Sequence, residues 1–139
     1  MKNFIRLIFV SIIYALFFVL ETELMLNVYR ISRLINIGVE TVSILITILV
    51  ILLVILSTFI FYVLNLNFLK QTKWNYLGSF ICLPFISLFI FLFTIIFPMH
   101  NEGDRPVPIM GLFFATSVIL YPFYLLIIIA ISSKNRENV

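Results

Sequence analysis

The carboxylate of Glu21 is the side chain in this sequence best placed for chemistry, because it directly follows a long apolar run, residues 4–20. An acid at the edge of an apolar environment can take up a proton or bind a cation, which makes it a candidate coupling group. The structural alternative is an interfacial anchor or an ion pair, in which Arg30 or Arg33 binds Glu21 or Glu40. A surface ion pair of this kind contributes only about 0–1 kcal/mol to stability.

Polar side chains inside the apolar runs recur on one side of each expected helix. At 100° per residue, the polar positions of the second run fall within an arc of about 60°, and those of the first run within about 80°. They are Glu40, Ser43, Thr47, Thr58 and Asn65 in the second run, and Asn3, Ser11, Tyr14 and Glu21 in the first. Lipid offers no hydrogen-bond partner, so we expect these stripes to face other helices. They either pack the helices together or line a polar path, for which the candidate positions are Glu21, Glu40, Tyr14 and Thr47.

Metal, cofactor and catalytic chemistry have few candidate residues. The segment from His100 to Asp104 contains one histidine and no cysteine, which are too few ligands for a stable zinc site. Cys82 has no second cysteine with which to form an internal disulfide, and we expect it to fill space in an apolar run. Neither a His-Glu-x-x-His pattern nor a Gly-x-Ser-x-Gly turn occurs. We therefore predict no catalytic, metal or cofactor site, and a protein that is not an enzyme.

Four apolar blocks must position these side chains. Each is about 17–23 residues long, the length that crosses about 30 Å of hydrocarbon at 1.5 Å per residue. The composition agrees, because 63% of the residues are hydrophobic and 11% are charged, against about 45–50% and 25% in a soluble domain. The sequence predicts an all-α integral membrane protein, a single domain over residues 1–139 with four transmembrane helices and short loops. The predicted spans are approximately residues 4–23, 41–66, 76–97 and 110–131.

Two features complicate this simple pattern. Residues 24–38 mix apolar side chains with Asn27 and two arginines, so we expect an extension of span one or a short interfacial helix that Gly38 ends. Pro84 and Pro122 lie inside spans three and four, where each removes a backbone hydrogen bond and favours a kink. Paired broken helices can mark a transporter site, but helix packing is the simpler explanation of these prolines.

Charge predicts the orientation. With the N-terminus inside, the inner side would hold Lys2, Arg6, Lys70, Lys73, Lys134 and Arg136, and the outer side Arg30, Arg33 and Arg105. Short cytoplasmic loops are enriched in lysine and arginine, so both termini are predicted to be cytoplasmic. The net charge of +3 is then explained by lysine and arginine beside anionic headgroups, without a nucleic-acid partner. No small-x-small cleavage pattern follows the first run, which we expect to remain as a span of a multi-pass protein of a bacterial cytoplasmic membrane.

Three functions remain open on this reading, and the least specific is a stress-related or lipid-interacting membrane protein without a specific ligand. The first is a non-catalytic membrane protein that is an accessory subunit or immunity-type partner of a membrane transporter or envelope complex. The alternative is a small homodimeric transporter that uses Glu21 as its proton- or cation-coupling group. An acid in the first helix is similar to the small four-helix drug exporters, but the glycine- and alanine-rich helices of those proteins have no counterpart among the bulky spans of this chain. The expected partners are the lipid bilayer and another membrane protein or a second copy.

Overall fold

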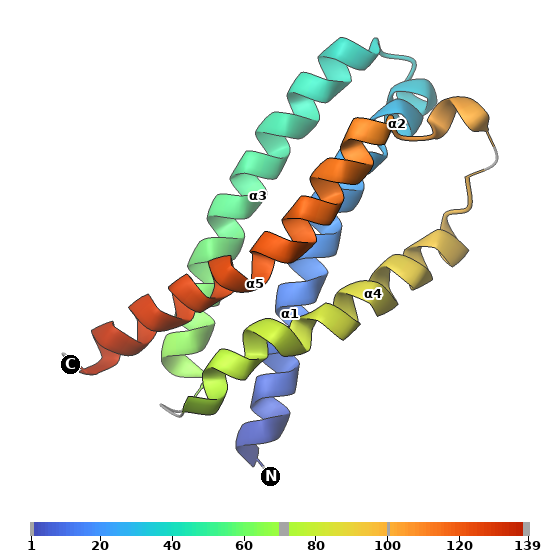
Figure 1. Ribbon diagram of the computed structural model, residues 1–139. Coiled ribbons are helices and arrows are strands. Elements are labelled where there is room, and N and C mark those ends of the chain that lie inside the picture. The colour runs from blue at the N-terminus through green and yellow to red at the C-terminus, as the bar shows by residue number, and fades with distance from the viewer. Residues whose placement is uncertain (1, 70–72, 100, 138–139) are drawn as a thin grey trace.

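The computed structural model describes residues 2–69, 73–99 and 101–137, and this part of the chain is helical apart from short connections (Figure 1). The long helices are α1 (Lys2–Leu26), α3 (Val39–Asn67), α4 (Gly78–Ile96) and α5 (Pro108–Glu137). Shorter elements join them: α2 (Val28–Ile35), η1 (Lys73–Leu77) and η2 (Glu102–Asp104). The beginning of α1 and the end of α5 lie at one end of the bundle, and α2 and η2 lie at the other.

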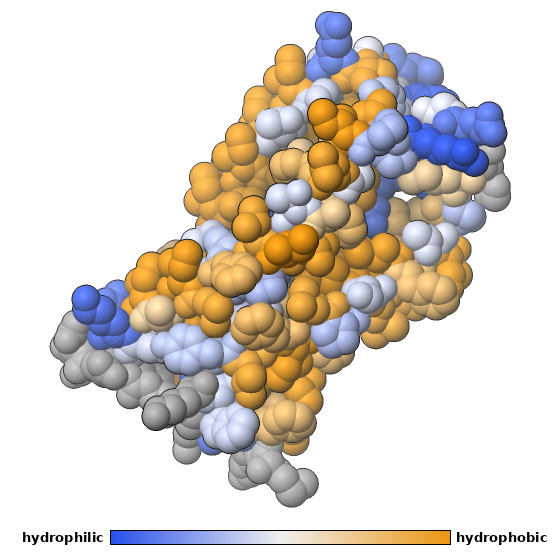
Figure 2. Space-filling view, viewed as in Figure 1, coloured by the Kyte–Doolittle hydropathy of each residue, from blue (hydrophilic) through white to orange (hydrophobic). Residues whose placement is uncertain are grey.

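Four helices in the described residues are long and apolar enough to cross a membrane, as the sequence predicts. These stretches are Asn3–Leu26, Val39–Asn67, Trp74–Ile96 and Pro108–Asn135. Figure 2 shows a broad hydrophobic surface along their length, with hydrophilic residues gathered toward the two ends of the molecule. This distribution is typical of a multi-pass membrane protein, because only the ends of such a bundle meet water.

The segment after the first span forms a separate short helix. At Asn27 the chain turns from α1 into α2, and Val28 of α2 packs against Val42 and Ile46 of α3. Asn36 ends α2 in the left-handed conformation, with φ 54°, whereas Gly38 has φ −55° and precedes α3. The expectation that Gly38 ends this helix is therefore wrong, because asparagine also tolerates the left-handed conformation.

The half of the bundle that contains the ends of the chain is tightly packed, and we call it the closed half. Large side chains from all four long helices are fully buried there, among them Tyr14, Phe61, Ile86 and Leu125. It comprises residues 7–19 of α1, 57–65 of α3, 78–86 of α4 and 121–132 of α5.

The opposite half, next to α2, is loosely packed, and we call it the open half. Within the described residues, α4 buries nothing after Ile86 and α5 buries nothing before Tyr121. Its buried residues lie from the end of α1 to α2, in η2, and in α3 where α2 packs on it. Figure 1 shows the cause, since α4 diverges from α1 and α5 as it runs toward this end.

The two interior prolines lie inside continuous helices. Pro84 is in α4 and Pro122 is in α5. In Figure 1, α5 changes direction about midway along its length, and a proline inside a helix is the usual cause of such a bend. The bend accompanies the change from the exposed first part of α5 to the buried part that begins at Tyr121.

Candidate functional site

A column of polar side chains runs between α1, α3 and α5. In the closed half, the Tyr14 hydroxyl donates to Oδ1 of Asn65 at 2.8 Å, and Nδ2 of Asn65 donates to the Phe61 carbonyl at 2.8 Å. The Tyr121 hydroxyl donates to the Tyr14 carbonyl at 2.7 Å, which ties α5 to α1. Both the oxygen and the nitrogen of the Asn65 amide thus have hydrogen-bond partners, and these side chains bond three helices together in the interior of the bundle.

The column continues into the open half through Glu21. The Ser57 hydroxyl of α3 donates to Oε1 of Glu21 at 3.1 Å, and the hydroxyl of the next residue, Thr58, shares a short hydrogen bond with that of Tyr124. The rings of Tyr121 and Tyr124 lie 5.8 Å apart and join the two parts of the column. The column is therefore a series of short hydrogen-bonded pairs linked by a ring contact.

Glu21 also faces a groove between α1, α3 and α5. The groove has a volume of about 400 Å³, and it is lined by apolar side chains of the three helices together with Glu21, Thr22, Ser117, Tyr121 and Tyr124. A titratable carboxylate beside tyrosine hydroxyls at the wall of an apolar groove is an arrangement that can hold a cation or transfer a proton. We call this groove, with the polar column behind it, the Glu21 site.

The structure brings together two of the four positions predicted from the sequence. Tyr14 and Glu21 both belong to the polar column. Glu40 and Thr47 are exposed on α3, away from the other helices, and Thr47 donates only to the Ser43 carbonyl of its own helix at 2.8 Å. The expectation that the whole second stripe faces other helices is therefore wrong in the open half, because the described helices leave the side of α3 that contains Glu40 and Thr47 exposed.

Ser57 is a contact that the sequence pattern missed. It is buried, and its hydroxyl is the one that meets Glu21. At 100° per residue it falls outside the arc of the predicted stripe, although it is adjacent to Thr58 in the sequence. Ser57 and Glu21 lie on separate helices, and a single sequence gives no signal that these two residues meet.

The arginines of α2 bind the connection between α4 and α5 instead of Glu21 or Glu40. Arg33 donates from Nε to Oδ1 of Asp104 at 2.9 Å and from Nη2 to Oδ2 at 2.6 Å. Arg30 donates from Nη1 to the Phe97 carbonyl at 3.0 Å. The expected pairing of these arginines with Glu21 or Glu40 is therefore wrong in the described part of the chain.

The bidentate pair also sets the charge of Asp104. Its side chain is only 4% exposed, whereas that of Arg33 is 50% exposed. The hydrogen bonds from Arg33, aided by its charge, hold the pKa of Asp104 below its ordinary value. Two parallel hydrogen bonds from a planar guanidinium fix geometry as well as charge, so this pair fastens α2 to η2 at the end of the open half.

No group of three potential metal ligands lies together in the described residues. His100 lies outside them, so the segment considered for a metal has only Asn101–Asp104 described. Comparison of the chain with protein-family models, curated proteins and solved structures gives no match. Its function must therefore be argued from its own residues.

Proposed function

We propose that this chain is a non-catalytic membrane protein that binds another membrane protein, as an accessory subunit or immunity-type partner of a transporter or envelope complex. The observation that supports this most is the uneven packing of the bundle. The polar side chains of the closed half are bonded within the chain, while α4 and α5 leave their parts of the open half uncovered. Long unburied helices that share a membrane with other proteins offer a surface for helix–helix contact.

Orientation is part of the proposal, with both termini in the cytoplasm. The beginning of α1 and the end of α5 lie at the same end of the bundle, and in the sequence six of the nine basic residues belong to the two termini or to the segment between α3 and α4. This asymmetry follows the positive-inside rule.

Site-specific photo-crosslinking in native membranes tests the partner directly. A photoreactive residue replaces Ile48, which is exposed in the open half of α3, and in a matched control it replaces Ile127, which is exposed in the closed half of α5. We expect a discrete protein adduct from position 48 and only lipid adducts from position 127. Lipid adducts alone from both positions would contradict the proposal.

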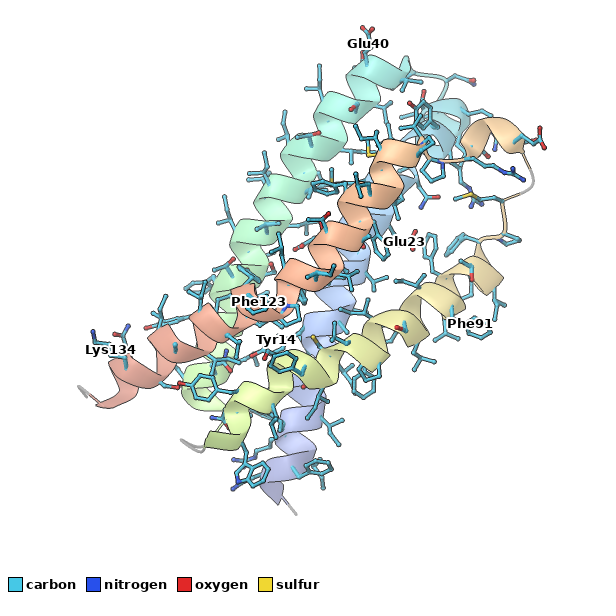
Figure 3. All side chains as sticks on the ribbon, in the orientation of Figure 1. Tyr14, Glu23, Glu40, Phe91, Phe123 and Lys134 are labelled. Carbon is cyan, nitrogen blue, oxygen red and sulfur yellow. The ribbon has the colours of Figure 1, made fainter. Side chains whose placement is uncertain are left out.

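A homodimeric transporter is the second candidate, and the Glu21 site favours it. Glu21 is the acid whose carboxylate both contacts another span, through Ser57, and faces an apolar groove. The matched pair of variants is Glu21→Gln and Glu40→Gln, since Glu40 is an exposed acid in the first turn of α3 (Figure 3). Proton-coupled flux in vesicles that contain only this protein, abolished by Glu21→Gln and kept by Glu40→Gln, would replace the first proposal with this one.

A further inference from the structure

A second groove opens on the other side of α1, between α1, α2 and the diverging part of α4. Its volume is about 640 Å³, and its walls are apolar except for Glu23, Asn27 and Arg30 at the end next to α2. Figure 3 shows Glu23 projecting into the space between α1 and α4. This volume lies within the range of roughly 300–1,000 Å³ found for ligand sites. We call it the Glu23 groove.

The length of the Glu23 groove matches one leaflet of a bilayer. Its lining on α1 extends from Leu16 to Asn27, a rise of about 16 Å at 1.5 Å per residue. Half of a hydrocarbon core of about 30 Å is about 15 Å. An acyl chain that fills the apolar part, beside Phe89 and Phe93, therefore places its headgroup at the level of Asn27.

Asn27, which lines the polar end of the groove, has a side-chain oxygen that accepts no hydrogen bond from the described residues. Nδ2 of Asn27 donates to Oε2 and to the backbone oxygen of Glu23, both at 2.9 Å. Asn27 is 5% exposed, and its Oδ1 atom is buried with no hydrogen-bond partner in the described part of the chain. A buried acceptor without a donor is costly. Oδ1 and the adjoining Glu23 carboxylate together match an ammonium group, which has three donors and no acceptor.

Arg30 adds the opposite charge one helical turn from Asn27. Its Nη1 donates to the Phe97 carbonyl at 3.0 Å, and the guanidinium lies 5.9 Å from the Phe97 ring centroid. A guanidinium has five N–H donors, so this bond leaves others for a phosphate. Glu23, Asn27 and Arg30 thus provide an acid, a buried acceptor and a base at the mouth of an acyl-sized groove. This combination matches a headgroup that contains both an ammonium and a phosphate group.

We propose that the Glu23 groove binds a phospholipid with a primary-amine headgroup. One acyl chain lies between α1 and α4, the ammonium group binds Glu23 and Asn27, and the phosphate binds Arg30. The inference does not depend on the proposed partner function, because its test uses the purified chain and a lipid readout.

Native mass spectrometry of the purified full chain tests the headgroup preference. The protein is mixed in detergent with equal amounts of phosphatidylethanolamine, phosphatidylcholine and phosphatidylglycerol that have identical acyl chains. We expect about tenfold more bound phosphatidylethanolamine than phosphatidylcholine, because methylation removes the N–H donors and a hydrogen bond to a charged group is worth about this factor. Glu23→Gln should lose the preference, and Glu40→Gln, at an exposed position outside the groove, should keep it.

A second pair of variants tests the apolar part of the groove. Leu20 lines the groove, whereas Leu52 is exposed on α3 and lies outside it. Leu20→Trp should reduce the amount of bound phosphatidylethanolamine, and Leu52→Trp should leave it unchanged. Equal binding of the three lipids, an unchanged preference in Glu23→Gln, or a protein dimer that excludes lipid from this site would each overturn the inference.

Discussion

The two halves of the bundle are built from the same four apolar helices, yet one is closed and the other is open. In the closed half, small and polar residues such as Ser11, Asn65 and Ser79 are buried between helices, whereas Thr47, Gly111 and Thr116 of the open half are exposed. Lipid tails are as apolar as leucine, so apolar surface alone does not drive membrane helices together. Close packing and hydrogen bonds therefore decide where the bundle closes.

The crossing of α1 and α4 shows how the closed half is held. A Cβ atom at Gly78 would lie 3.0 Å from Cδ1 of Leu7 and 3.4 Å from Oγ of Ser11. The Ser11 hydroxyl donates to the Gly78 carbonyl at 3.1 Å, and Cys82, one turn further along α4, is fully buried. Small residues one turn apart allow two backbones to approach, as in other membrane helix pairs.

The largest expected effect comes from filling this crossing. Gly78→Leu should lower the free energy of unfolding in detergent by about 2 kcal/mol or more, because Leu7 can move away from one methyl group but not from a branched side chain. The matched control is Gly111→Leu on the open half of α5, where a Cβ meets nothing within 4 Å. Similar destabilisation by both variants would show that the α1–α4 crossing is not a special contact.

A smaller effect separates two threonines of one helix. Thr58→Val removes the hydrogen bond to Tyr124 in the polar column, and Thr47→Val removes only a bond within α3. A hydrogen bond between membrane helices is worth about 0.6 kcal/mol on average. We expect a destabilisation of that size for Thr58→Val and a change close to zero for Thr47→Val in detergent unfolding. A larger effect at position 47 would place a helix of this chain against that part of α3.

The smallest effect is the pH dependence of the end of the open half. The pKa of Asp104 is lowered by the hydrogen bonds from Arg33, so the pair stabilises the folded state above the ordinary carboxyl pKa. This stabilisation is lost as the pH falls through the lowered pKa, because the unfolded state then binds the proton more readily. Hydrogen exchange of α2 and η2, corrected for intrinsic rates, should therefore become faster as the pH falls through the lowered pKa of Asp104. Asp104→Asn should remove this dependence, and its persistence in the variant would assign it to another group.

The sequence predicts the number of spans and two members of the polar column, because both can be recognised from neighbouring residues in the sequence alone. Apolar length identifies a span without reference to its neighbours, and Tyr14 and Glu21 are recognisable as polar residues in or beside an apolar run. Gly78 gave no comparable signal, because a single glycine at the start of a span resembles an ordinary helix boundary. Its close contact with α1 depends on two segments that are distant in the sequence.

The remaining errors have the same physical origin. Helical periodicity shows that Thr47 and Thr58 share a side of α3, but it does not show how far a neighbouring helix extends along that side. Arg33 and Asp104 are separated by 71 positions, and one sequence contains no information about which acid an arginine meets. The position of a residue along the bundle decided these contacts, and only the three-dimensional structure supplied it.

Lipid contact at positions 93 and 61 of the purified chain tests the central claim, that the helices of the open half leave space between them and those of the closed half fill it with side chains. Trp74 is the one tryptophan of the chain, so Trp74→Phe provides a background for Phe93→Trp in the Glu23 groove and Phe61→Trp in the closed half. In vesicles of phospholipid with brominated acyl chains, the fluorescence at position 93 should be strongly quenched and that at position 61 should be protected. Equal quenching at the two positions would contradict the division of the bundle into closed and open halves.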